Sequence, residues 1–312
     1  MTDQAPIVRP LPDYAISPPP AVPSPAAMTT GAVPGGCVDC GQSAANPAAV
    51  ASPAVAGGYV YAVGRLHARF PSLGAEREYA QLTGADPDAV VHTGQLKDAL
   101  AVAEHRYLAR QMCWVFSGPT ADACAVVARD ERDLDELIDT LVDDEQVVQA
   151  LVGSPAGTLS PSPCLAAGLA VMWPDQLLSF SLDEFLDALP GPDEGKPPKG
   201  KDAEPWRQTA RSLFDHLTRR SENRGLTDEH RAMNYMALRY PQVYHLIFNA
   251  QREGKALIGV EPRLAAGGDR RLVDVRFVLR HANTHVVERY FCRVDTTDVF
   301  PFLTNPLTLT YD

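Results

Sequence analysis

The chain has 312 residues, of which 45% are hydrophobic and 21% charged, and its formal net charge is −11 at pH 7. The composition is that of a globular protein, whereas the negative charge argues against nucleic acid or an anionic membrane as the main partner, because both attract clustered Lys and Arg. We interpret the one basic cluster as a solvated helix end: Arg219, Arg220 and Arg224. No stretch reaches the roughly 18 apolar residues of a transmembrane helix. The N-terminus lacks a secretory signal, so we expect a cytoplasmic location.

Residues 1–57 are expected to form a disordered tail. They hold 11 of the 27 prolines and a single basic residue, Arg9. Proline at this density removes backbone donors and favours extended conformations, so the segment cannot build a core. Its functional interpretation is a tether or peptide ligand for partner enzymes, and the alternative is a plain linker.

The folded region is predicted to begin as a mixed strand and helix segment. A strand is predicted from Tyr59 to Leu66, and Ser72 and Gly84 are expected to bound the helix that follows. The further elements predicted here are a helix over 94–109, a hairpin formed by "QMCWVFS" and "ACAVVA", a helix capped by Asp130, and strands at 147–152 and 168–173. The Pro/Gly-rich stretch 189–205 is predicted to be an exposed loop that separates this region from a helical one.

The second half is predicted to contain three helices and then an antiparallel sheet. The helices cover 206–222, the segment from Thr227 to "RYP", and 242–252. A three-stranded meander follows: "ALIGVEPRL", "RLVDVRFVLRH" and "HVVERYFCRVD". Apolar and polar residues alternate along the middle strand, which indicates one buried and one wet face. Strand and helix runs do not alternate steadily, so the predicted class is α+β, with 58–312 as a single domain.

Several stretches, taken together, carry a family resemblance: "YVYAVGRLHARFPSLGAEREYAQLTG", "HRYLARQMCWVF", "ARDERDLDELID", "TDEHRAMNYMALRYPQVY" and "VERYFCRVDTTDVFPFL". In order and spacing, 58–312 resembles the C-terminal domain of unknown function of patellamide-type cyanobactin maturation proteases (PatG-like proteins). Those proteins are subtilisin-like enzymes that cut and macrocyclise ribosomally made peptides. This sequence shows no Ser/His/Asp constellation in subtilisin order, so we expect the domain to stand alone here and do not carry the macrocyclase activity over.

The most specific cysteine spacing lies in the tail, in "GGCVDCGQ" at 35–42. Cys37 and Cys40 have the spacing of a zinc knuckle, but one CxxC is only half of a tetrahedral site. Cys113 and Cys164 are the natural candidates for the other two ligands, and both sit where the resembling family has cysteine. The hypothesis is a structural zinc ion that fixes the tail to the domain. The alternatives are core thiols at 113 and 164 and, less compatible with the Pro/Ala/Gly flanks, a redox pair.

Two groups of polar residues are weaker candidates for a site. Asp228, His230 and Asn234 cluster at a helix start and offer groups for general acid–base work, although helix capping and packing against a neighbour are the better explanation. "GRLHARFP" places Arg65, His67 and Arg69 on one face of a strand, where they could grip a carboxylate or a peptide. Polar residues that alternate along a strand more often simply face water.

The function favoured by this sequence is that of a non-catalytic accessory protein in a ribosomal-peptide (cyanobactin-like) maturation pathway. It would recruit the precursor peptide or a partner protease or modifying enzyme. The main alternative is a zinc-dependent enzyme acting on the modified peptide, with one coordination position open to water. A fold-stabilising or oligomerisation module is the third possibility.

Overall fold

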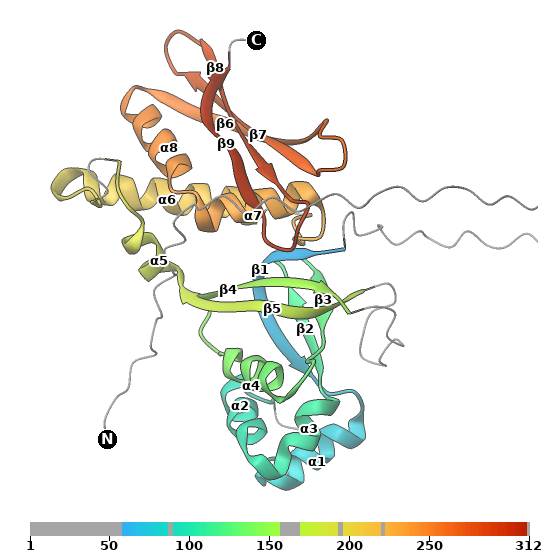
Figure 1. Ribbon diagram of the computed structural model, residues 1–312. Helices are drawn as coiled ribbons and strands as arrows, with labels where there is room; N and C mark the ends of the chain where they lie inside the picture. Colours follow the sequence, from blue (N-terminus) through green and yellow to red (C-terminus); the bar gives the residue numbers. More distant parts are fainter. Residues whose placement is uncertain (1–57, 87–89, 157–168, 193–195, 220–221, 311–312) are drawn as a thin grey trace, which may run out of the picture. The chain divides into compact units, whose positions relative to one another are not determined.

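The computed structural model describes residues 58–310 apart from 87–89, 157–168, 193–195 and 220–221 (Figure 1). The predicted tail, with Cys37 and Cys40, lies outside the described residues, as does Cys164. Two sheets and several helices make up the described chain, which confirms the α+β class.

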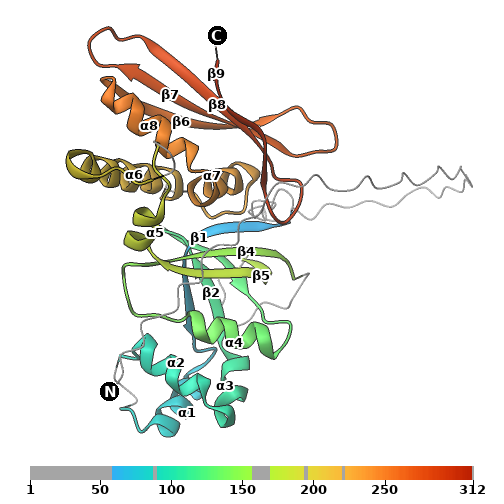
Figure 2. The same cartoon turned by 60° about the vertical axis from the view of Figure 1, so that its left-hand side comes forward.

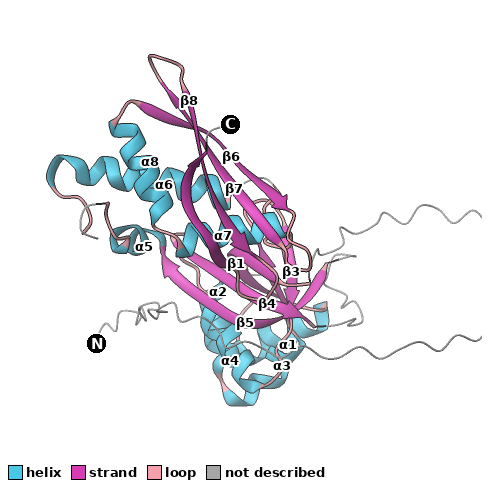
Figure 3. Ribbon diagram, turned by 45° about the horizontal axis from the view of Figure 1, so that its top comes forward, coloured by secondary structure: helices cyan, strands magenta, loops and turns pink. Residues whose placement is uncertain are grey.

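The first sheet is a closed five-stranded barrel (Figure 3). Its strands are β1 (Val60–Arg69), β2 (Cys113–Ser117), β3 (Asp122–Val126), β4 (Val147–Pro155) and β5 (Ala170–Ser181), in the order β1-β2-β3-β5-β4. The β3–β5 pair is parallel and the other pairs are antiparallel, so the sheet is mixed, as predicted. Strand β1 pairs with two neighbouring strands along its length: Val60–Gly64 pairs with β4, and Arg65–Arg69 pairs with β2.

Four helices lie together against the barrel (Figure 2). They are α1 (Leu73–Thr83), α2 (Thr93–Ala101), α3 (Arg106–Gln111) and α4 (Glu131–Thr140). The predicted caps are confirmed: the Ser72 hydroxyl accepts from the backbone amide of Ala75, and Gly84 ends α1 in the left-handed conformation at φ 68°. Asp130 likewise caps α4 through its carboxylate. Apolar side chains from these helices and the barrel strands form one buried cluster, which includes Leu100, Phe116 and Leu137.

The prediction of a single helix over 94–109 is wrong, because the helix is interrupted at Val102. Its backbone is extended there (φ −68°, ψ 129°), and a 3₁₀ turn, η1 (Ala103–His105), separates α2 from α3. The His105 ring nitrogen Nδ1 donates to the carbonyl of Ala99 at 2.8 Å. The His105 side chain therefore hydrogen-bonds to the Ala99 carbonyl, the acceptor that the backbone amide of Ala103 would have in a continuous helix.

The second half contains α5 (Leu182–Ala188), the 3₁₀ turn η2 (Gly200–Asp202), α6 (Ala203–Thr218), α7 (Asp228–Arg239) and α8 (Gln242–Arg252). Helix α6 begins and ends earlier than the predicted 206–222, so the predicted loop 189–205 includes η2 and the first turn of α6. Among the described residues, no helix is both long and apolar enough to cross a membrane.

The C-terminal sheet has four antiparallel strands, not the predicted three. They are β6 (Lys255–Ala265), β7 (Leu272–His281), β8 (Val287–Asp295) and β9 (Phe302–Thr310), in that order. Strand β9 was not predicted because Pro301 lies directly before it and Pro306 interrupts its pattern. Proline is tolerated there because β9 is an edge strand that bonds to β8 alone.

The alternation predicted for the middle strand is confirmed on β7. Val273, Val275 and Phe277 are fully buried, and they belong to a second apolar cluster with α6, α7 and α8, which lie beside this sheet (Figure 1). Val63 of β1 is part of the same cluster. Helix α7 contacts both β7 and β1, so it links the C-terminal sheet to the barrel.

Candidate functional site

The three weak catalytic candidates all lie on α7, where Asp228 and Asn234 are buried. The hydroxyl of Thr227 caps the helix by accepting from the backbone amide of His230 at 3.2 Å, which confirms the predicted helix start. Asp228 and Asn234 are buried, at 3% and 1% exposure. A catalytic role for the trio stays a prediction, but Asp228 and Asn234 are engaged in contacts that hold the fold together.

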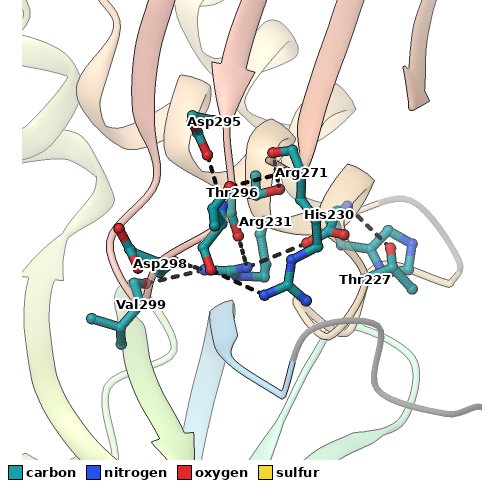
Figure 4. Close-up of polar contacts among 10 residues, drawn as sticks. Thr227, His230, Arg231, Arg271, Asp295, Thr296, Asp298 and Val299 are labelled. Carbon is teal, nitrogen blue, oxygen red and sulfur yellow. Dashed lines mark hydrogen bonds and ion pairs between the residues drawn. The ribbon is translucent and has the colours of Figure 1, made fainter. Parts of the chain in front are cut away.

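Arg231, which lies between Asp228 and Asn234 in the sequence of α7, is fully buried and was not singled out from the sequence (Figure 4). Its Nη1 donates to the carbonyl of Thr296 at 2.6 Å and approaches the Asp228 carboxylate at 3.3 Å. Its Nη2 donates to the carbonyls of Asp298 and Val299. One guanidinium thus holds the whole β8–β9 connection against the start of α7. Burial lowers the pKa of Arg231 to about 10 and raises the pKa of Asp228, as expected when charged groups leave water.

The β8–β9 connection is also fixed from the β7 side. The backbone amide of Arg271 donates to the Thr297 hydroxyl at 2.8 Å, and the amide of Thr296 donates to the Arg271 carbonyl at 2.8 Å. Asp295 accepts from the amide of Thr297, also at 2.8 Å. These contacts surround Arg231 with ordered backbone groups (Figure 4), so this polar cluster is a structural junction.

Asn234 joins α7 to the barrel. Its Nδ2 donates to the carbonyl of Tyr61 on β1 at 2.7 Å, and its Oδ1 accepts from Asn223 at 2.8 Å. The amide of Tyr61 in turn donates to the carbonyl of Gly225 at 2.9 Å. Gly225 has a positive φ of 71°, and a Cβ there would lie 2.4 Å from the Tyr61 carbonyl oxygen. Only glycine therefore fits this close approach between the turn before α7 and β1.

The predicted zinc ligands can be placed for Cys113 only. This residue is 5% exposed on β2, and its sulfur is disulfide-bonded, which differs from the thiolate that the sequence analysis expected. Cys124 on β3 and Cys292 on β8 are buried free thiols. Within the ranges that the structure describes, no group of three or more His, Cys, Asp or Glu side chains could hold a metal ion.

The remaining candidate, the polar face of β1, opens onto a cleft of about 300 Å³. Its lining comes from β1, the β2–β3 turn, the start of β4 and the end of α6. Val63, Val148 and Phe214 provide apolar surface, while Arg65, His67 and Arg219 provide nitrogen donors. Gly64 keeps this part of β1 close to β2, since a Cβ at Gly64 would lie 2.0 Å from the carbonyl oxygen of Ser117.

The three polar residues predicted to share the β1 face do not act together. Arg69 pairs with Asp122 through two hydrogen bonds of 2.7 and 2.9 Å and is not part of the cleft lining. Burial, and after it the nearby Arg69 charge, lowers the pKa of His67, so this imidazole is neutral at pH 7. Arg65 is partly buried, its backbone pairs with β2, and its guanidinium forms no ion pair or hydrogen bond with any described residue. Among the described cleft residues, its guanidinium is therefore a charge available to a ligand.

Arg219 is the cleft residue whose role the sequence analysis missed. It was interpreted as part of a solvated helix end, and it is indeed 57% exposed and 3.0 Å from Asp215, one turn earlier on α6. The fold nevertheless brings it to the cleft that Arg65 lines. No local pattern signals this convergence, because it depends on how α6 packs on β1.

The described chain is thus an α+β fold with a small, partly cationic cleft beside a closed barrel. Residues 200–309 match the family model described as PatG C-terminal. Among solved structures, the chain is similar to one titled PatG Domain of Unknown Function, with a TM-score of 0.62 and 15% identity over 81% of this chain and 99% of that one. None of the curated proteins matches the chain. Residues 200–309 are therefore similar to the PatG C-terminal family, and the fold resembles that of the PatG domain of unknown function, in line with the sequence resemblance.

Proposed function

We propose that the protein is a non-catalytic accessory protein of a ribosomal-peptide maturation pathway, and that it binds peptide at the cleft lined by Arg65. In this role it would bring a precursor peptide to a partner protease or modifying enzyme. The PatG-like domain supports the link to such pathways. A cytoplasmic location belongs to the same proposal, because precursor peptides of this kind are made and modified there.

The single observation that carries the binding role is the guanidinium of Arg65. Arg65 is partly buried and has no ionic partner among the described residues, so its guanidinium has lost part of its hydration without an equivalent interaction from that part of the chain. It lies in a cleft of about 300 Å³ with apolar surface next to it, a size that falls at the lower end of known ligand sites. An anionic group of a peptide would supply the missing partner.

An affinity selection from a pool of random linear hexapeptides tests this proposal. Wild-type protein should enrich a subset of peptides that an Arg65→Glu variant does not enrich, and mass spectrometry should find the recovered peptides unchanged. Enrichment equal to that of the variant would contradict binding at the cleft. Cleaved or otherwise altered peptides would contradict the non-catalytic role.

We also propose that a zinc ion joins the tail to the domain through four cysteines: Cys37, Cys40, Cys113 and Cys164. The CxxC spacing supports this arrangement, and the disulfide at Cys113 is the competing one. Metal analysis of reduced, purified protein should find one zinc per chain, lost in Cys37→Ser and retained in the control Cys124→Ala. No zinc, or zinc unaffected by Cys37→Ser, would contradict the staple. A site with three ligands and a bound water would favour the zinc enzyme instead.

A further inference from the structure

The charges and apolar residues of the cleft lined by Arg65 indicate which chemical groups its ligand should carry. This inference rests on the proposed function, peptide binding at the cleft. Two positive side chains reach the cleft from segments that are distant in sequence, Arg65 on β1 and Arg219 just after α6. The whole chain has a net charge of −11, so this pair of arginines is a local exception. Such an exception favours an anionic group at this position.

The other charges at the cleft limit the ligand to a single negative charge. Glu145 is one of the lining residues, and the carbonyl end of α6 points its partial negative charge toward the same region. Arg219 is partly offset by its pair with Asp215. The available positive charge is therefore close to one unit, that of Arg65, which matches a carboxylate better than a phosphate dianion.

The apolar lining shows what must accompany the carboxylate. Val63 lies two residues before Arg65 on β1, so both side chains project from the same face of the strand, about 6–7 Å apart. The partly buried Val148 extends this apolar surface, and the buried Phe214 also lines the cleft. A ligand that satisfies both features carries a carboxylate and an aliphatic side chain a few ångströms apart.

The last residue of a peptide has this arrangement, because its carboxylate and its side chain share one Cα. An internal Asp or Glu does not, since its carboxylate ends the side chain that would have to fill the apolar part. We infer that the cleft binds the C-terminal carboxylate of a linear peptide that ends in an aliphatic residue, with Arg65 as the carboxylate ligand. Arg219 forms the outer wall of the site.

Fluorescence anisotropy with three labelled tetrapeptides tests the inference. The first is fluorescein-Gly-Gly-Ala-Leu with a free carboxylate, the second is its C-terminal amide, and the third is fluorescein-Gly-Gly-Ala-Glu with an amidated C-terminus. The free acid should bind at least about tenfold more tightly than either amide, because a charge-assisted hydrogen bond contributes about 1.5–3 kcal/mol. Arg65→Gln should abolish this preference.

Arg280→Gln is the matched control, because Arg280 is an exposed arginine on β7, outside the cleft, and it should retain the preference. Thermal melts should be the same for all three proteins, since the Arg65 guanidinium makes no ion pair or hydrogen bond with any described residue and Arg65→Gln leaves the backbone pairing with β2 unchanged. Equal binding of acid and amide, still weakened by Arg65→Gln, would overturn the carboxylate inference but leave peptide binding at the cleft intact. No binding of any probe, together with no enrichment from the hexapeptide pool, would overturn the proposed function as well.

Discussion

Replacing the buried arginine of α7, by Arg231→Met, should destabilise the protein more than any surface substitution. Methionine keeps much of the side-chain volume but removes every guanidinium hydrogen bond. Three carbonyls of the β8–β9 connection then lose their donor, and the buried Asp228 carboxylate loses its ion-pair partner and keeps only the positive charge of Arg271 nearby. Breaking a buried ion pair by removing one partner costs about 3–5 kcal/mol. This is a large part of the roughly 5–15 kcal/mol that stabilises a typical domain.

Urea unfolding followed by circular dichroism measures this loss. The midpoint should fall with little change in the slope m, since the surface exposed on unfolding stays similar. The pH dependence gives a second check. Because burial raises the pKa of Asp228 in the folded state, its protonation favours folding, and that contribution is lost as the pH rises through the folded pKa. The deficit of Arg231→Met should therefore shrink at acidic pH.

A matched control separates burial from simple loss of charge. Arg280→Met removes an exposed arginine and should change the unfolding free energy by no more than about 0.5 kcal/mol. A double variant, Asp228→Asn with Arg231→Met, should recover part of the loss, because the uncompensated carboxylate is gone. A loss below about 1 kcal/mol for Arg231→Met alone would refute the view that this arginine holds the β8–β9 connection in place.

Three further outcomes follow from single sites. Gly225→Ala should cost at least about 2 kcal/mol, because its Cβ would meet the Tyr61 carbonyl at a positive φ; an unchanged melting temperature would contradict that close approach. The Arg69 guanidinium lowers the pKa of Asp122, so the pair stabilises the folded state above the unfolded pKa and the benefit is lost as the pH falls through the folded value. Asp122→Asn should therefore cost about 0.5–1 kcal/mol at pH 7, a value kept small by the partial exposure of both side chains, and progressively less as the pH falls through the folded pKa of Asp122; a pH-independent cost would contradict this assignment. Burial raises the thiol pKa of Cys124 and of Cys292 to about 12. Iodoacetamide should therefore alkylate these two thiols at pH 8 only after denaturation. Rapid labelling of the native protein would contradict their burial.

The sequence was sufficient where the structural signal is local. Helix caps at Ser72, Asp130 and Thr227 are short-range hydrogen bonds between neighbouring residues, so their spacing identifies them directly. The alternation along β7 was equally clear, because one face of that strand is buried and the other is not. Features that depend on packing between distant segments were not accessible. Closure of the barrel requires the parallel β3–β5 pairing, which no local pattern encodes.

The polar sites show the same division. An arginine within a charged helix start is normally solvated, so nothing in "TDEHRAMNY" distinguishes Arg231 from its neighbours. Its burial arises only because the β8–β9 connection folds over α7. The polar face of β1 was recognised from its spacing, but the separation of Arg69 from the cleft and the approach of Arg219 to it depend on tertiary contacts.

Calorimetric titration of a peptide selected from the hexapeptide pool into three proteins tests the central claim most directly. The three are the wild type, Arg65→Gln and the control Arg280→Gln. Binding at the cleft predicts one peptide per chain for wild type and control, with an affinity at least about tenfold lower for Arg65→Gln. The same affinity for all three would place the peptide elsewhere on the molecule, and that result would contradict the assignment of the cleft lined by Arg65 as the functional site.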